Sequence, residues 1–209
     1  MVNVEVYGDF KATCTQRVLI LLEELNLKYS VKKIDLMKGE QKDPEYLKLN
    51  PFGKVPAIEY GDRTLFESRS ILRYIAKNNV DIEDLLGDTD TDLWLEVESQ
   101  HFNPPASKIV YEKVFKKWFD ETQKPDEDVL LESVKQFEKV LDIYEERLGN
   151  HNYISGDNYT IADISHIPYI NQLLRCGYKE LFKSRTNVYK WVKRIIKREN
   201  VQYVLSEAK

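Results

Sequence analysis

The stretch Asn50-Pro51-Phe52-Gly53-Lys54-Val55-Pro56-Ala57 decides the fold, together with Leu65-Phe66-Glu67-Ser68-Arg69-Ser70-Ile71 a few residues later. Between them, Gly61-Asp62 joins two short runs at 55–60 and 63–66, which is a strong signal for a β-hairpin. A Val-Pro-Ala sequence on its own is usually a simple turn. Here the proline opens a hairpin, and the hairpin leads into a Glu-Ser pair and a helical pattern. A turn alone does not explain this combination.

The residues around this hairpin alternate between strand and helix patterns. The predicted elements are a strand at 2–7, a helix at 14–26, a strand at 29–36, a short helix at 44–49 and a helix at 68–78. The first helix carries one apolar face, formed by Val18, Leu19, Leu21, Leu22 and Leu25. This order, β-α-β followed by β-β-α, predicts a thioredoxin-like domain over residues 1–79.

The remainder of the chain is predicted to be helical. Residues 80–90 are acidic and polar, which is typical of a linker, and residues 91–209 then form an all-α domain. The first predicted helix, at 91–119, is kinked at Pro104-Pro105 because proline has no N–H to donate to the helical hydrogen bonds. The second, at 127–148, is ended by Gly149. A third helix starts at Thr160, and the last covers about 187–198. The fold class is an α+β domain followed by an α domain.

The composition excludes several classes of protein. With 42% hydrophobic and 32% charged residues, the chain of 209 residues is predicted to be globular. The net charge of −4 argues against a nucleic-acid binder, and the basic residues between Lys190 and Arg198 repeat like the solvated face of an amphipathic helix. His101, His151 and His166 are isolated and show no metal-ligand spacing, so no metal site is expected.

The location expected from the sequence is the cytoplasm. Cys14 and Cys176 are far apart, and sparse cysteine is typical of a reducing compartment. The start of the chain alternates like a strand and lacks the basic and apolar segments of a signal peptide. No run of about 18 apolar residues is present, so we expect no membrane span.

The two motifs around the hairpin resemble the glutathione-site signature of glutathione transferases, and three further stretches are similar to the plant phi class of that family. Those stretches are Gly39-Glu40-Gln41-Lys42, Asn103-Pro104-Pro105-Ala106-Ser107-Lys108, and the capping box Thr160-Ile161-Ala162-Asp163. The resemblance covers nearly all 209 residues. It implies the glutathione transferase fold, a thioredoxin-like domain with a cis-proline followed by an all-helical domain, with glutathione as co-substrate and no metal.

The resemblance also implies which residues hold glutathione. Pro56 is expected to be cis, so that the backbone of Val55 can pair with the cysteinyl unit as an added strand would. Glu67 and Ser68, where a strand enters a helix, are expected to bind the γ-glutamyl ammonium and carboxylate. The other expected contacts are Gln41, Lys42 and Lys54, which would reach the glycyl carboxylate, and Arg69, which follows the Glu-Ser pair.

One position departs from the phi-class pattern where the chemistry takes place. Aligned on Arg17, the catalytic serine of phi-class enzymes falls on Ala12. A free thiol has a pKa of about 8.5, and a hydroxyl that donates to sulfur favours the thiolate by roughly 1.5–3 kcal/mol. Ala12 offers no such donor. The Thr13 hydroxyl and the amides that open the first helix could replace part of it, and Cys14 could be a redox thiol, although simple packing of Cys14 is the more common case.

The resemblance places a hydrophobic substrate pocket beside glutathione. Its predicted lining is Phe10, Lys11, Ala12, Phe115, Phe119 and Tyr178. Phe102 and Tyr111 lie on the same predicted helix as Phe115, and core packing explains them equally well.

Three functions are consistent with the sequence. The first is a transferase that adds the glutathione thiolate to a hydrophobic electrophile, in plant detoxification or secondary metabolism, with general activity weakened by Ala12. The second is a non-catalytic ligandin that carries flavonoid-like metabolites. The third is a specialised glutathione-dependent biosynthetic enzyme whose substrate needs positioning more than thiol activation. The resemblance further implies a homodimer, with Arg69 toward the interface between the two copies.

Overall fold

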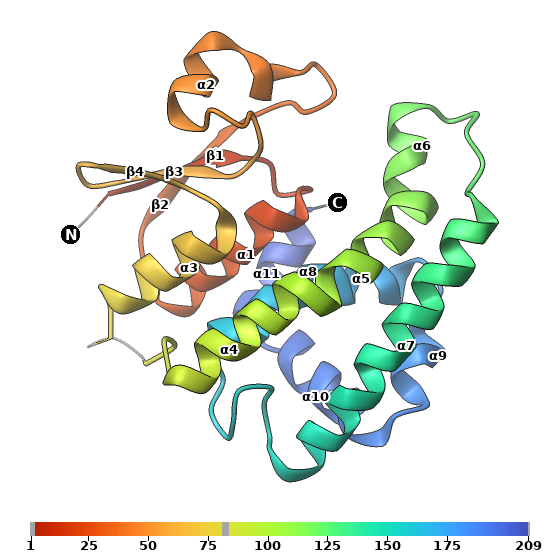
Figure 1. Ribbon diagram of the computed structural model, residues 1–209. Helices are drawn as coiled ribbons and strands as arrows, with labels where there is room; N and C mark the ends of the chain where they lie inside the picture. Colours follow the sequence, from red (N-terminus) through yellow and green to blue (C-terminus); the bar gives the residue numbers. More distant parts are fainter. Residues whose placement is uncertain (1–2, 81–83, 209) are drawn as a thin grey trace. The chain divides into compact units, whose positions relative to one another are not determined.

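The computed structural model describes residues 3–80 and 84–208 and divides the chain into two compact units, each with its own buried core. The first unit is Met1–Leu86 together with Arg198–Lys209, and the second is Gly87–Lys197 (Figure 1). Residues 81–83 of the predicted linker lie outside the described residues.

The first unit is built on a mixed sheet. Its strands are β1 (Val4–Gly8), β2 (Tyr29–Lys33), β3 (Ala57–Tyr60) and β4 (Arg63–Phe66), in the order β2-β1-β3-β4. β1 runs parallel to β2 and antiparallel to β3, and β3 and β4 form the predicted hairpin. In β1, Val4 and Val6 are fully buried and alternate with half-buried polar side chains, as the two-residue period of a strand requires.

Helices lie on both sides of this sheet. α1 (Thr13–Glu24) and α3 (Ser68–Lys77) pack against each other on one face, whereas α2 (Pro44–Leu49), which follows the 3-10 turn η1 (Glu40–Lys42), lies on the other side (Figure 1). The apolar face predicted for the first helix is buried, because its valine and leucines are all but inaccessible to solvent. The prediction of a thioredoxin-like domain is confirmed.

The first unit ends in a helix that the sequence pattern did not predict. α11 (Glu199–Glu207) packs against α1, and the guanidinium of Arg198 donates from Nε and Nη2 to the carboxylate of Glu24 at 2.7 and 2.8 Å. The Glu24 side chain is 3% exposed, so Arg198 replaces water as the partner of its charge. The expectation of a last helix ending near 198 was therefore wrong, and Arg198 is not part of a solvated basic face.

The second unit is all-helical, as predicted. Its first segment is one long helical run made of α4 (Thr89–Val97), η2 (Glu98–Phe102), α5 (Asn103–Val110), η3 (Tyr111–Phe115) and α6 (Lys116–Phe119). The helices that follow are α7 (Glu127–Asn150), α8 (Ile161–Arg175), α9 (Lys179–Lys183) and α10 (Thr186–Ile196). Gly149 does not end α7 as expected, because the helix continues to Asn150 and the chain becomes extended only at His151.

The prolines interrupt the long helical run by a local change in its hydrogen bonding. Proline has no N–H, and its ring crowds the carbonyl one turn earlier. For Pro104 and Pro105, those carbonyls belong to Gln100 and His101, and both lie in η2, which has π-helical hydrogen bonding. The interruption predicted at the Pro-Pro pair is thus a π-helical turn just before it.

The core of the second unit is aromatic and is fixed by the capping box at the start of α8. The Thr160 side chain accepts from the Ala162 amide at 3.3 Å, and the Asp163 carboxylate accepts from the Thr160 amide at 3.0 Å, which confirms the predicted box. Asp163 is fully buried and also accepts from the indole of Trp191 at 2.7 Å. The box therefore ties the start of α8 to α10.

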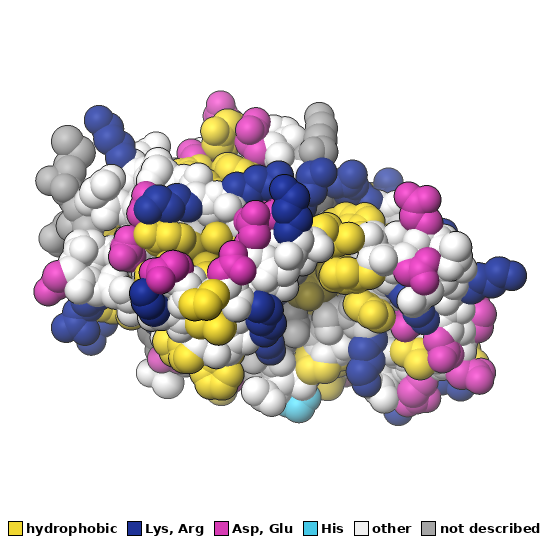
Figure 2. Space-filling view, turned by 90° about the horizontal axis from the view of Figure 1, so that it is seen from above, with side chains coloured by type: hydrophobic (Ala, Val, Ile, Leu, Met, Phe, Trp, Pro, Cys, Tyr) yellow, Lys and Arg dark blue, Asp and Glu magenta, His cyan; other side chains and the backbone are white. Residues whose placement is uncertain are grey.

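Charged side chains of both signs are mixed on the surface. In Figure 2, Lys and Arg side chains are interspersed with Asp, Glu and apolar side chains, and neither sign covers the whole face shown.

Within the described residues, no helix is long and apolar enough to cross a membrane.

Candidate functional site

The loop between β1 and α1 is held in place by its own backbone and by Gln16. The Ala12 amide donates to the Asp9 carbonyl oxygen at 2.9 Å, and Gln16 Nε2 donates to the Phe10 carbonyl oxygen at 2.7 Å. Ala12 is the N-cap of α1, and within the described residues its position makes no side-chain capping hydrogen bond to the first amides of this helix. Those amides, together with the helix dipole, form a region of positive potential at Ala12 and Thr13.

A buried arginine links the start of α1 to the start of α3. Arg17 is inaccessible to solvent, and its Nη1 donates to Cys14 Sγ at 3.3 Å and to Ser68 Oγ at 3.5 Å. Cys14 is thus packed against a guanidinium, and Ser68 is positioned by the same group. Thr13 is 5% exposed, so its side chain lies inside the unit rather than in open solvent.

The loop before β3 is fixed by hydrogen bonds to its carbonyls. Tyr46 Oη and Asn50 Nδ2 both donate to the Lys54 carbonyl oxygen at 2.7 Å, and the Phe52 amide donates to Asn50 Oδ1 at 3.1 Å. Burial raises the pKa of the Tyr46 hydroxyl to about 12, so this donor keeps its proton at physiological pH. The Val55–Pro56 peptide bond is cis, as the resemblance implied.

Glu67 has a backbone conformation that is unusual for a residue other than glycine. Its φ of 67° lies in the left-handed region, and it stands directly before the first residue of α3. Such conformations cost about 1–3 kcal/mol and are concentrated at functional sites. Glu67 is exposed, Arg69 is half-buried and Ser68 is 5% exposed. The first turn of α3 therefore begins at the surface, and the Ser68 side chain is buried.

Gln41 and Lys42 lie in η1 and contact the loop that contains Gly53. Lys42 Nζ donates to the Phe52 carbonyl oxygen at 3.1 Å, and Gly53 has a φ of 58°. A Cβ at position 53 would meet the Gln41 carbonyl oxygen and Lys42 Nζ at 2.7 Å, so only glycine permits this approach. Gln41 Oε1 is buried and has no hydrogen-bond partner among the described residues, which leaves it open to a ligand. Lys54 is exposed on the neighbouring loop.

The second unit contains a pocket of about 320 Å³ on η3, which we call the η3 pocket. Tyr111 and Phe115 line it with one face of the long helical run, and Val129 and Tyr169 line it from α7 and α8. The remaining lining residues are Ser107, Lys108 and Glu112. Most of the lining side chains are aromatic or have long apolar stems, which suits a hydrophobic ligand.

The residues predicted for a hydrophobic pocket lie in different surroundings. Phe115 lines the η3 pocket, whereas Phe119, which is 61% exposed, and Tyr178, which is half-buried, do not. Half-buried Phe10 and Ala12 and exposed Lys11 belong to the first unit. That all six form one substrate pocket stays a prediction.

Sequence reasoning left Phe102 and Tyr111 undecided and missed five residues that line the η3 pocket, namely Ser107, Lys108, Glu112, Val129 and Tyr169. Phe102 is fully buried, with its ring centroid 4.6 Å from that of His166, so it is a core residue, whereas Tyr111 lines the η3 pocket. Tyr111 and Phe115 are four residues apart, and this spacing in the sequence already indicated that they share one face of a helix. Val129 and Tyr169 could not be found in this way, because they come from other helices.

Within residues 3–80 and 84–208, no cluster of His, Cys, Asp and Glu side chains could hold a metal ion.

Comparison with known proteins identifies both units of the chain. The family model of the glutathione S-transferase N-terminal domain matches residues 2–77, and that of the C-terminal domain matches residues 102–199. Glutathione S-transferase F6 of Arabidopsis thaliana is 40% identical over 98% of this chain and 100% of its own length. Glutathione S-transferase APIC of Nicotiana tabacum is 41% identical over 93% of each chain.

Solved structures give the same result. Glutathione transferase F7 from Populus trichocarpa matches with a TM-score of 0.94 at 35% identity over 99% of each chain. Poplar glutathione transferase F1 matches with a TM-score of 0.93 at 38% identity, over 100% of this chain and 99% of that one. These relatives are plant phi-class proteins, in agreement with the motifs around Val55, Glu67 and the Pro-Pro pair. The chain therefore belongs to the glutathione S-transferase family, in which it is an enzyme of the plant phi class.

Proposed function

We propose that this enzyme conjugates glutathione to a hydrophobic electrophile and that its general activity is weakened by the alanine at position 12. The observation that carries the glutathione site is Glu67, whose left-handed backbone is held directly before the opening turn of α3. Strained conformations of this kind are concentrated at functional sites, and a ligand that needs the α3 amides and the Ser68 hydroxyl presented together accounts for this one.

The expected contacts divide among the three parts of glutathione. The γ-glutamyl carboxylate binds at Ser68 and the start of α3, and the Glu67 carboxylate pairs with the ammonium group, with Arg69 alongside. The Val55 backbone, next to the cis peptide bond, pairs with the cysteinyl unit. The glycyl carboxylate is held by the ammonium groups of Lys42 and Lys54 and by the side-chain NH2 group of Gln41, which is the donor end of that amide.

The reaction requires the thiol to lose its proton before it attacks. The thiolate sulfur forms a bond to the electrophilic carbon, the leaving group departs with its electron pair, and the thiol proton goes to solvent. Ala12 gives no donor to the sulfur, so the amides at the start of α1, worth about 0.3–1 kcal/mol, and the Thr13 hydroxyl are the groups left to favour the thiolate. This is less than the roughly 1.5–3 kcal/mol that a hydroxyl donor to a charged group contributes.

The electrophile is expected to be hydrophobic and aromatic. The η3 pocket, with Tyr111 and Phe115, has the size and lining for such a molecule. A solved relative, glutathione S-transferase I from maize, is 30% identical and was crystallised with an atrazine glutathione conjugate. By analogy we propose a role in plant detoxification or secondary metabolism, in the cytoplasm.

The second candidate function is a ligandin that carries flavonoid-like metabolites without chemistry. One observation favours it, namely that Ala12 removes the activating hydroxyl while the glutathione-binding motifs stay intact. A specialised biosynthetic enzyme, whose substrate is reactive enough to need positioning alone, is the third. Steady-state turnover of the purified protein with glutathione and a generic aryl halide separates the transferase from the ligandin. Measurable turnover supports the transferase, whereas no turnover together with micromolar binding of flavonoid-like dyes supports the ligandin.

Retention on immobilised glutathione tests the binding site separately from the chemistry. Glu67→Ala combined with Ser68→Ala should abolish retention, because it removes the partner of the ammonium and a donor to the carboxylate. Ser70→Ala, on the exposed side of α3, is the matched control and should be retained like the native chain. Unchanged retention of the double variant would show that the site lies elsewhere.

A further inference from the structure

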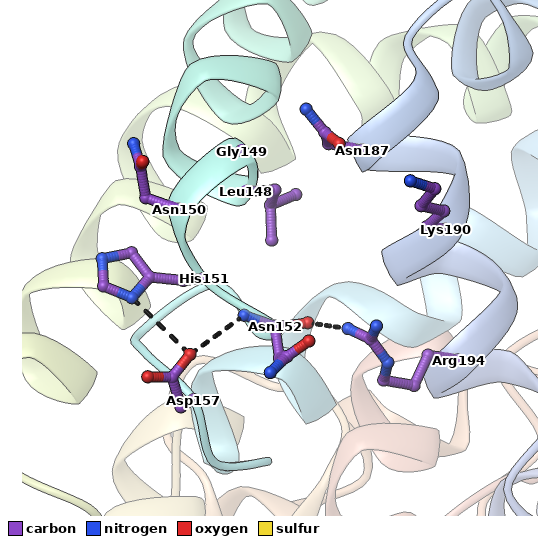
Figure 3. A pocket seen from close by; sticks show the side chains of 9 residues that line it. All are labelled: Leu148, Gly149, Asn150, His151, Asn152, Asp157, Asn187, Lys190 and Arg194. Carbon is purple, nitrogen blue, oxygen red and sulfur yellow. Dashed lines mark hydrogen bonds and ion pairs between the residues drawn. The ribbon is translucent and has the colours of Figure 1, made fainter.

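A second pocket in the helical unit is polar, and no part of the proposed transferase function uses it. It lies between the end of α7 and α10, has a volume of about 310 Å³, and is named here the α7–α10 pocket (Figure 3). Its walls are the last turn of α7, the loop that follows as far as Asp157, and three residues of α10. Apart from Leu148, every side chain that lines it is polar, and it shares no lining residue with the η3 pocket.

The α10 wall carries two cations that are held differently. Lys190 and Arg194 lie one helical turn apart and face the same side of α10 (Figure 3). The Arg194 guanidinium is fixed, because Nη1 donates to the Asn152 carbonyl oxygen and the group lies 5.3 Å from the centroid of the Tyr153 ring. The Lys190 side chain makes no hydrogen bond or ion pair with any residue that the structure describes. An anion placed beside Arg194 would therefore find a free ammonium group within reach.

The opposite wall carries hydrogen-bonding groups that are only partly used. His151 Nδ1 is buried but has no hydrogen-bond partner among the described residues. It lies 3.8 Å from Asp157 Oδ1, which is too long for a hydrogen bond. Asp157 Oδ1 accepts from the Asn152 amide at 3.3 Å, and its other oxygen is available to a hydroxyl donor (Figure 3).

The charges of the lining favour an anion bound by side chains rather than by a helix end. Two permanent cations face one carboxylate among the lining residues, so the pocket is positive even with a neutral histidine. The first amides of α10 are not available, because Asn187 and Val188 already donate to the Glu145 carboxylate at 2.9 Å. The positive charge of the site therefore comes from Lys190 and Arg194.

We propose that the α7–α10 pocket binds a small hydroxylated phosphomonoester, with the phosphate at Lys190 and Arg194 and the hydroxyl groups at Asp157 and His151. A guanidinium and an ammonium beside each other match the charge and the several acceptor oxygens of a phosphate. The volume corresponds to roughly ten water-sized groups, since a water takes about 30 Å³. Glycerol 3-phosphate has that size and that combination of groups, and the lack of apolar lining disfavours hydrophobic electrophiles.

Isothermal titration calorimetry of the full chain with glycerol 3-phosphate tests this proposal. We expect saturable binding with a Kd below about 1 mM, weakened at least about tenfold by Lys190→Ala. The matched control is Lys193→Ala, which makes the same charge change on the same helix outside the lining, where the ammonium lies 4.8 Å from the Tyr189 ring centroid. This control should alter the Kd by less than about twofold, because the Lys193 ammonium lies against the Tyr189 ring and outside the pocket lining.

A second variant fills the volume of the pocket and leaves its charges unchanged. A Cβ at position 149 would lie 3.5 Å from Asn187 Nδ2, across the pocket and free of clashes, so Gly149→Leu should fold and fill the space. It should abolish binding while every charge is kept. Inorganic phosphate should bind more weakly than the ester, and glycerol should not bind.

Several results would overturn the assignment. These are the absence of saturable binding up to about 10 mM, equal losses in the Lys190 and Lys193 variants, and unchanged binding in Gly149→Leu. Equal affinity for inorganic phosphate and the ester would likewise overturn the proposed contacts with hydroxyl groups.

Discussion

At the scale of single residues, the chemistry depends on what stands at the start of α1. Ala12 closes the loop after β1 through its amide, and its methyl group cannot donate to a sulfur. The nearest side chains that bear a hydroxyl or a thiol are Thr13, which is 5% exposed, and Cys14, which already accepts from Arg17. Thiolate formation is therefore the step that we expect to limit turnover.

Ala12→Ser should raise turnover with an unreactive aryl halide, because the new hydroxyl can donate to the thiolate. A gain of about tenfold would correspond to roughly 1.4 kcal/mol removed from the barrier. The same change should lower the pKa of bound glutathione, which can be read from the thiolate absorbance against pH.

Thr13→Val in the native background is the companion variant, since it keeps the branched shape and deletes only the hydroxyl. Loss of activity in this variant would assign the thiol donor to Thr13. Intact activity here, together with no gain in Ala12→Ser, would show that neither hydroxyl matters and that the amides of α1 or the substrate carry the reaction.

At the scale of elements, the capping box of α8 makes stability depend on pH. Burial raises the pKa of Asp163 from 3.8 to about 6, although the Ile154 and Thr160 amides and the Trp191 indole donate to its carboxylate. A carboxyl group whose pKa is higher in the folded state favours folding when it is protonated. Its contribution is therefore present below pH 4 and is lost as the pH rises through 6.

The free energy of unfolding should accordingly fall between pH 4 and pH 7 by up to about 3 kcal/mol through Asp163, since one pKa unit is worth about 1.4 kcal/mol. Urea unfolding at a series of pH values measures this. Asp163→Asn should be less stable throughout, because the amide replaces one acceptor oxygen by a donor, but its pH profile should be flatter over this range. Parallel profiles for the two proteins would contradict the prediction.

The second element-scale prediction concerns the docking of α11. Arg198→Ala would leave the Glu24 carboxylate, which is 3% exposed, with Asn200 Nδ2 at 3.2 Å in place of the two guanidinium contacts. Loss of the partner of a buried charge should lower the free energy of unfolding by about 1–3 kcal/mol. Lys197→Ala changes an exposed neighbour and should have little effect. Chemical denaturation at one pH measures the free energy of unfolding of both variants. Equal values for the two variants would contradict the prediction.

These elements also show how far sequence reasoning reached. The hairpin around Gly61-Asp62, the buried face of α1 and the capping box at Thr160 were predicted because their signals are local in the chain. No local signal marked α11, because its docking depends on Glu24, which is far away along the chain. The cis bond at Pro56 followed from the family resemblance, whereas the strain at Glu67 and the open oxygen of Gln41 became visible only in the structure.

At the scale of the whole molecule, we propose that the chain forms a homodimer. Family resemblance pairs the first domain of one copy with the helical domain of the other, and a two-fold interface is self-complementary. The first unit exposes the aromatic ring of Phe52, which is 64% accessible to solvent. This ring is tilted relative to that of Phe66, with the two ring centroids 6.1 Å apart. Aromatic side chains are enriched among the residues that supply most of the binding energy of an interface, so we propose Phe52 as the anchor.

Sedimentation equilibrium of the native chain should therefore give twice the chain mass of 24.7 kDa at micromolar concentration. Phe52→Ala should raise the dimer dissociation constant at least about tenfold, because a buried aromatic anchor is worth 2 kcal/mol or more at an interface. Met37→Ala is the matched control, since Met37 is 57% exposed on the same unit but is not held at the rigid loop before the cis bond. A native chain that sediments as a stable monomer would contradict the dimer. A native dimer that Phe52→Ala and Met37→Ala weaken equally would keep the dimer but remove Phe52 as its anchor.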